Sequence, residues 1–124
     1  MADADGLRPL IWMASSKKDQ LACPDDVQDA FGYALHMAQE GGKHDHAKPF
    51  SGLGPGLLEV VEDYTGDTYR AVYTVKLVTA VYVLHVFKKK SKRGIATPKA
   101  DVDLIKSRLK DARELDRQRQ EQQS

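Results

Sequence analysis

The stretch from Thr68 to Pro98 constrains the fold of this chain more than any other segment. Its two β-rich runs, Tyr69 to Leu77 and Ala80 to Phe87, are separated by a short connection, which predicts an antiparallel hairpin. A lysine cluster follows at once, and Thr97-Pro98 then has the form of a helix start. These features predict a small sheet with a cationic edge, a surface suited to a phosphate-bearing partner.

The rest of the sequence predicts helices and strands on both sides of this hairpin. An apolar run, 9–14, indicates a first strand, and Ser16 to Asp19 has the form of a capping box for a short helix. A second helix is predicted between Pro24 and Gly41, a loop over 43–56, and a further strand over 57–62. The last helix carries a narrow apolar stripe of Val102, Ile105, Leu109 and Ala112. The predicted fold class is α+β: a small, antiparallel-rich sheet with two N-terminal helices packed on it and a C-terminal helix.

The length and composition fit a single domain of 124 residues. We expect a flexible tail over 1–8, a folded domain over 9–112 and a polar tail prone to disorder over 113–124. The lone Cys23 excludes an internal disulfide, and no apolar run is long enough to span a bilayer. These features lead us to expect a cytoplasmic protein with no membrane partner.

The charge is unevenly distributed. The whole chain has a formal net charge of +1, whereas residues 88–110 contain nine basic and two acidic side chains and so carry +7. Five of these cations are packed into six positions, as Lys88, Lys89, Lys90, Lys92 and Arg93. Such runs are most often solvated loops, but each phosphate that they contacted would add to affinity for a nucleic acid.

Arg70 is the one arginine inside the predicted hairpin. The strand pattern alone favours an ion pair with Glu59 or Glu62 of the neighbouring strand. The alternative is a phosphate clamp, for which the planar guanidinium is well shaped.

Two side chains just before the lysine cluster also have two readings. By strand alternation His85 shares a face with Val81, Val83 and Phe87, which favours a core histidine over a proton-transfer group. Phe87 is either the last core residue of its strand or a surface on which a base stacks. A His-Asp-His run at 44–46 lacks the spacing of a zinc site, so neither a metal nor another cofactor is expected.

Four segments, in their order and spacing, resemble one protein family. They are Lys48 to Leu53 (KPFSGL), Tyr69 to Tyr73 (YRAVY), Leu84 to Ser91 (LHVFKKKS), and Thr97-Pro98. The chain resembles the RelE/ParE superfamily of bacterial toxins, in its phage-derived Gp49-like, HigB-like branch, over residues 9–112. The resemblance implies a RelE-like fold and a toxin of a type II toxin–antitoxin system. It also implies a cognate antitoxin as partner, commonly a helix-turn-helix DNA-binding protein.

The resemblance further implies a ribosome-dependent endoribonuclease that cuts mRNA on the ribosome without a metal ion. It assigns catalytic roles to Arg70, Lys48, His85, Lys89 and Lys90. The basic run and the aromatic residue before it predict RNA binding by Phe87, Lys88, Lys92 and Arg93. Two departures are present: Ser51 replaces the lysine that relatives carry before Gly-Leu, and residues 58–61 lack their arginine.

Two other functions remain open at this point. The same scaffold serves ParE-like toxins, which poison DNA gyrase without cleaving RNA, so the fold does not choose between them. The lost basic positions also fit an inactive, phage-derived protein that only binds its partner.

Overall fold

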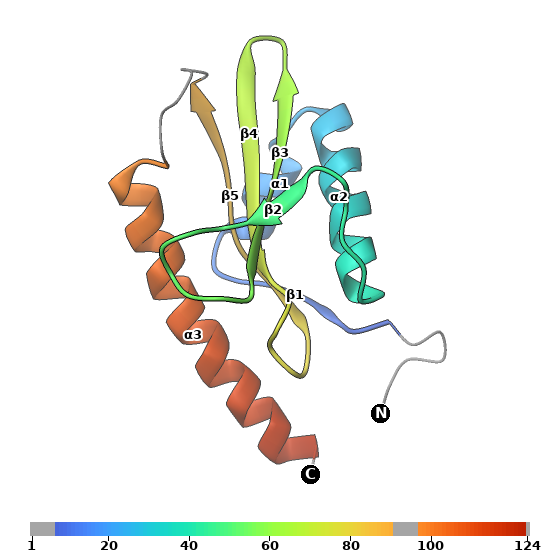
Figure 1. Cartoon of the computed structure of the whole chain (residues 1–124), viewed down its shortest axis with the longest axis vertical. Helices are drawn as coiled ribbons and strands as arrows, with labels where there is room; N and C mark the ends of the chain where they lie inside the picture. Colours follow the sequence, from blue (N-terminus) through green and yellow to red (C-terminus); the bar gives the residue numbers. More distant parts are fainter. Residues whose placement is uncertain (1–6, 91–96, 124) are drawn as a thin grey trace.

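The computed structural model of the chain describes residues 7–90 and 97–123 (Figure 1). These residues form an α+β fold, which confirms the predicted class. The elements in chain order are β1 (Leu10–Trp12), α1 (Ser16–Leu21), α2 (Asp25–Gln39), β2 (Ala47–Pro49), β3 (Leu57–Tyr64), β4 (Asp67–Thr74), β5 (Val81–Lys90) and α3 (Lys99–Gln123). No helix among the described residues is long and apolar enough to cross a bilayer.

One mixed sheet runs through the molecule in the order β1-β5-β4-β3-β2. The short strand β1 pairs with β5 in parallel, and the other neighbours are antiparallel. The prediction of an uninterrupted loop over 43–56 was wrong, because Ala47–Pro49 pairs with β3 as the edge strand β2. Proline is tolerated on an edge strand, where its missing N–H leaves no partner unsatisfied.

The helices cover both faces of the sheet, so the fold has three layers. On one face the predicted stripe of α2, with Phe31 and Leu35 fully buried, packs against Val60, Ala71 and Tyr73. On the other face the stripe of α3 packs against the hairpin core of Val72, Tyr82 and Leu84. Figure 1 shows α3 as a long helix beside β5. The two apolar stripes that the sequence predicts therefore build two separate cores.

A β-bulge in β5 changes which face its later residues occupy. Tyr73 of β4 pairs with Val83, but Val72 pairs with His85, so Leu84 is one residue extra. His85 consequently faces α3, on the side opposite to Val81 and Val83. The expectation that His85 shares a face with those two valines was wrong, because simple alternation fails at a bulge.

The helix α3 continues to Gln123, well past Ala112, where the predicted apolar stripe ends. Its extension is held by a buried carboxylate, Asp116, which accepts hydrogen bonds from the backbone N–H groups of Val78 and Thr79 at 3.0 and 2.7 Å. Beyond Ala112, α3 is therefore held by the polar contacts of Asp116 together with the partly buried Leu115.

The start of α1 differs from the predicted capping box. Ser16 lies inside the helix, and its hydroxyl donates to the carbonyl of Val83 in β5 at 3.1 Å. The residue before it, Ser15, occupies the cap position without a side-chain hydrogen bond to the free backbone amides. Ser16 thus joins α1 to the sheet and does not cap the helix.

Candidate functional site

A pocket of about 290 Å³ opens on the α3 side of the sheet, where β2, β3 and β4 lie beside the start of α3. Three of its lining residues, Lys48, Ser51 and Arg70, are ones that the sequence singles out. The full lining is Lys48, Phe50, Ser51, Glu59, Arg70, Thr97 and Val102. We call this hollow the Arg70 pocket.

A carboxylate inside the Arg70 pocket joins two cations from neighbouring strands. Glu59 of β3 lies with its Oε2 3.0 Å from Nη1 of Arg70 on β4, and its Oε1 is 3.8 Å from Nζ of Lys48 on β2. The ion pair that the strand pattern predicts for Arg70 is therefore present. Glu59 and Arg70 are largely buried, while Lys48 is 61% exposed.

The guanidinium of Arg70 is only partly satisfied. Its Nε is buried, and no acceptor among the described residues lies within hydrogen-bond distance of it. A buried donor without a partner is costly. The Arg70 pocket thus combines an oriented guanidinium, an exposed ammonium and one carboxylate.

Lys89 lies close to this group although it comes from β5. It pairs with Thr68 of β4, two residues before Arg70, and so lies on the same face of the sheet. Burial lowers the pKa of Lys89, and the positive charge of Arg70 lowers that pKa further. The negative charges of Glu59 and Asp101 raise the pKa of Lys89, but by less. Lys89 is therefore a lysine that releases its proton more readily than an exposed one.

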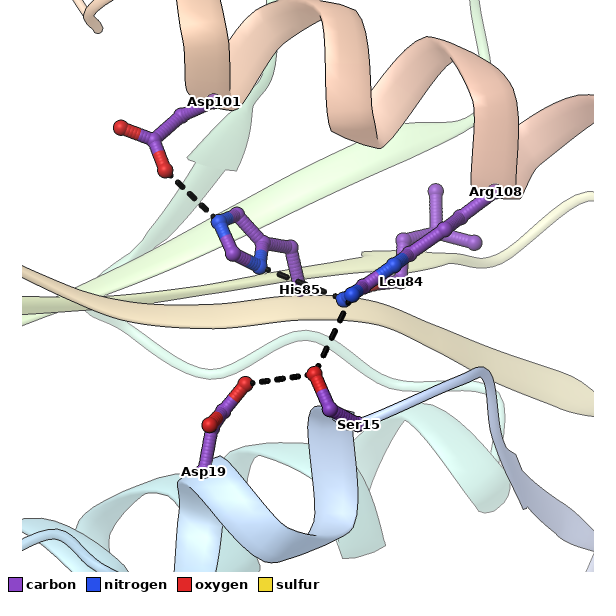
Figure 2. A network of polar contacts seen from close by, with 6 residues as sticks. All are labelled: Ser15, Asp19, Leu84, His85, Asp101 and Arg108. Atoms are coloured by element: carbon purple, nitrogen blue, oxygen red, sulfur yellow. Dashed lines mark hydrogen bonds and ion pairs between the residues drawn. The ribbon is translucent and has the colours of Figure 1, made fainter.

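His85 belongs to a different set of contacts, shown in Figure 2. Its Nε2 lies 2.8 Å from Oδ1 of Asp101 on α3, and its Nδ1 is 3.4 Å from Nη1 of Arg108. Because a guanidinium has no acceptor, we assign Nδ1 as the acceptor in that contact, and Nε2–H then donates a hydrogen bond to Asp101. The network therefore fixes both the tautomer and the ring orientation of His85.

Arg108 also joins the two helical layers across the edge of β5. Its Nη1 donates to the carbonyl of Leu84 at 2.9 Å, and its Nη2 donates to Oγ of Ser15 at 3.1 Å. That hydroxyl in turn donates to Oδ2 of Asp19 in α1 at 2.9 Å (Figure 2). One arginine thus spans from α3 to α1.

Phe87 is a neighbour of both His85 and Arg70. Its ring stacks on the imidazole of His85, with centroids 4.5 Å apart and planes at 14°. It is half-buried and packs against the core beneath α3, directly opposite Arg70 in the strand register. One ring face is therefore occupied.

The structure divides the predicted basic cluster. Lys88 faces the α1 side of the sheet and forms an ion pair with Asp67 at 3.7 Å, so it points away from the Arg70 pocket. Lys90 ends β5, and the predicted RNA-binding residues Lys92 and Arg93 lie outside the described residues.

Sequence reasoning missed Asp101 and Arg108 as neighbours of His85. Both lie on α3, 16 and 23 residues further along the chain, so no local pattern links them to His85. Their spacing of seven places them on one side of the helix, which is the signal that could have indicated a shared partner. Within 7–90 and 97–123, no group of three or more His, Cys, Asp or Glu side chains is arranged to hold a metal ion.

Comparison with known proteins identifies the family. The family model described as phage-derived protein Gp49-like (DUF891) matches residues 18–110, a span that contains the Arg70 pocket and the residues His85, Asp101 and Arg108. Neither the curated proteins nor the solved structures contain a match to the chain. The match covers most of the chain, so this protein belongs to the Gp49-like family, which lies within the RelE/HigB-like group of toxins.

Proposed function

We propose that this chain is the toxin of a type II toxin–antitoxin system and that it cleaves messenger RNA on the ribosome. Membership of a toxin family supports the first part of this proposal. The observation that supports the second part is the Arg70 pocket, where a guanidinium with an unpartnered buried Nε stands beside Lys48 and Glu59. The proposed partners are a cognate antitoxin and messenger RNA, and the proposed site of action is the cytoplasm.

The proposed reaction is an internal transfer at one phosphate of the RNA. The ribose 2′-oxygen forms a bond to the adjacent phosphorus and loses its proton, and the bond from phosphorus to the 5′-oxygen breaks. The products are a 2′,3′-cyclic phosphate and a 5′-hydroxyl, which takes up one proton. The step needs a proton acceptor, stabilisation of the extra charge on the phosphate oxygens, and a proton donor.

The groups around the Arg70 pocket suit these three requirements. Arg70 presents a planar fork of donors to phosphate oxygens, and Lys48 adds an exposed positive charge. Glu59 is a carboxylate in the pocket lining and accepts a proton once the phosphate has taken over its two cations. Lys89, whose pKa burial lowers, is suited to proton donation.

His85 has a supporting place in this proposal. Its Nε2 is engaged by Asp101, and one face of its ring is covered by Phe87. We therefore assign it to positioning of Phe87 and Asp101 at the flank of the site. In this assignment the remaining exposed part of Phe87 contacts a base of the RNA.

The test compares the chain with an Arg70→Ala variant in a bacterial host. Each is induced without an antitoxin, and messenger 5′ ends are mapped within minutes. We expect new ends in translated regions, in phase with codons, that are absent from Arg70→Ala. Arg117→Ala is a matched control, because Arg117 is an exposed arginine already engaged by Glu114 and Glu121.

Three results would contradict the proposal. Identical new messenger 5′ ends from Arg70→Ala would show that the Arg70 pocket takes no part in cleavage. Growth arrest with intact messengers and DNA breaks would indicate a gyrase poison. Expression with no arrest and no new ends would indicate an inactive binding protein.

A further inference from the structure

A second hollow adjoins the Arg70 pocket on the outer side of α3. It has a volume of about 730 Å³ and lies between the 52–53 segment and the helix. Its lining is Gly52, Leu53, Asp103, Lys106, Ser107, Leu109, Lys110 and Arg113. We call it the α3 groove.

The cations of the α3 groove follow one side of the helix. Lys106, Lys110 and Arg113 are spaced by four and then three residues, which aligns them on a single face. They span about 10 Å of helix, the rise of about three stacked nucleotides at about 3.4 Å each. All three side chains are exposed.

These three cations have no carboxylate partner within residues 7–90 and 97–123, whereas other cations of α3 do. Lys99 pairs with Asp103 at 2.7 Å, which also neutralises the carboxylate in the groove lining. The α3 groove therefore presents three positive charges to solvent.

The α3 groove and the Arg70 pocket are lined by consecutive residues of the chain. Ser51 lines the pocket and Gly52 lines the groove, and Val102 and Asp103 are divided in the same way on α3. The groove is therefore a neighbouring surface for a polymer that has one phosphate against Arg70. Leu53, which is partly exposed, adds apolar surface beside the cations, which suits ribose and base faces better than it suits an acidic peptide.

We propose that the α3 groove binds the phosphate backbone of the RNA strand that leads away from the scissile phosphate, through Lys106, Lys110 and Arg113. This inference rests on the proposed function for the position of the scissile phosphate. It adds a binding site that the reaction itself does not require. The site is independent of base identity, because its contacts are to phosphates.

The test measures binding, not cleavage. The probe is a fluorescently labelled RNA oligonucleotide of mixed sequence with 2′-O-methyl groups, which cannot be cut because the attacking hydroxyl is blocked. Fluorescence anisotropy gives its affinity for the wild-type chain and for the triple variant Lys106→Gln, Lys110→Gln, Arg113→Gln. The matched control is Lys17→Gln, Lys18→Gln, Lys43→Gln, which removes the same charge from exposed lysines outside the groove lining.

We expect the triple variant to bind the RNA about 10- to 100-fold more weakly near 0.1 M salt. The slope of log affinity against log salt concentration should become less steep by about 2, as expected for three lost phosphate contacts on a single strand. The control should stay close to wild type. Circular dichroism and thermal unfolding should be unchanged, because all six residues are exposed.

Three results would contradict the proposal that the α3 groove binds RNA. The first is a triple variant that binds RNA with wild-type affinity, and the second is a control variant that loses as much affinity as the triple variant. The third is displacement of the RNA by polyglutamate as readily as by unlabelled RNA, which would indicate an acidic protein as the occupant. Failure of the proposed function is a separate result, because a chain that never cleaves RNA can still lose binding in the triple variant alone.

Discussion

The guanidinium of Arg70 reaches the carboxylate of Glu59 diagonally across the β3–β4 pair, with 3.0 Å between Nη1 and Oε2. The residue directly opposite Arg70 in the register is Val61, and the one opposite Glu59 is Val72. Diagonal neighbours on one face of a sheet are within reach of long side chains. The contact inclines Arg70 toward β3 and β2, so Glu59 sets the direction in which the guanidinium points.

The first prediction concerns the geometry of the charged group at position 70. Arg70→Lys keeps the charge but loses the planar fork, and lysine is no substitute where two phosphate oxygens are held at once. We expect the rate of messenger cleavage on programmed ribosomes to fall by about 10²- to 10³-fold. Arg117→Lys, on the exposed side of α3, should cleave at the wild-type rate. A wild-type rate for Arg70→Lys would show that positive charge alone is sufficient.

The second prediction concerns the protonation of Lys89. Burial and the charge of Arg70 lower its pKa, so Lys89 should lose its proton at a lower pH in the folded chain than in the unfolded chain. NMR titration of the lysine side-chain signals measures this difference directly. In Arg70→Ala the pKa of Lys89 should rise, because one of the two causes of its lowering has been removed.

The lowered pKa of Lys89 also has a consequence for cleavage. If Lys89 donates the proton, the rate should fall on the alkaline side at a pH below the ordinary lysine value of about 10.4. In Lys89→Arg this fall should move to higher pH, because a guanidinium keeps its proton. An alkaline limb at the same pH in both proteins would exclude Lys89 as the donor.

The third prediction concerns the stability supplied by Asp116. Its Oδ1 accepts from the N–H and the hydroxyl of Thr79 and from the hydroxyl of Tyr82, and its Oδ2 accepts from Val78 and Gln120. In Asp116→Asn an amide N–H₂ must replace one of these oxygens and face a donor. We expect a loss of about 2 kcal/mol in the free energy of unfolding, measured with denaturant. Asp111→Asn, an exposed change on the same helix, should lose little.

The stabilisation by Asp116 should depend on pH with a defined sign. Burial raises the pKa of Asp116, but the hydrogen bonds from Thr79 and Val78 outweigh it and hold the pKa below its ordinary value. The carboxylate therefore stabilises the fold above the unfolded pKa of about 3.9, and this contribution is lost as the pH falls through the folded value. The difference between wild type and Asp116→Asn should shrink in that acid range. A difference that stays constant there would contradict the assignment.

The fourth prediction concerns the reactivity of Cys23. Burial raises the pKa of this thiol, and the charge of Asp19 raises it further, so little thiolate is present near pH 8. A chromogenic disulfide reagent should label the native chain much more slowly than the unfolded chain. A cysteine introduced at the exposed position Ala100 supplies the fast reference. Equal rates at the two positions would show that the α1 side opens readily.

Much of the Arg70 pocket could be predicted from the sequence. Lys48, Arg70 and Lys89 lie on one face because regular alternation holds along β2 and β4, and the hairpin register then brings Lys89 beside them. The strand pattern likewise predicts the contact between Arg70 and Glu59. These side chains come from neighbouring strands joined by short connections, so strand alternation in the sequence is enough to predict that they share a face.

The partners on α3 could not be predicted in the same way. Asp101 meets His85, and Asp116 meets Thr79, because of the angle at which α3 crosses the sheet. Nothing in a local window specifies that angle. The docking of Asp116 has a weak signal, since it continues the spacing of Ile105, Leu109 and Ala112 along the helix. A charged residue such as Asp116, at the next position of an apolar stripe, is normally interpreted as the end of that stripe.

The additional residue in β5 changes the numbering of the strand without changing where its later residues lie. Leu84 shifts the parity of the strand, so that odd-numbered positions beyond it face α3 while odd-numbered positions before it face α2. A deletion of Leu84 would remove the bulge and make Val83 and His85 consecutive, and these two already lie on opposite faces. Lys89 would therefore stay on the face of Arg70, and Lys88 would stay on the opposite face. What the extra residue adds is a leucine side chain in the core beneath α3 and the carbonyl to which Arg108 donates.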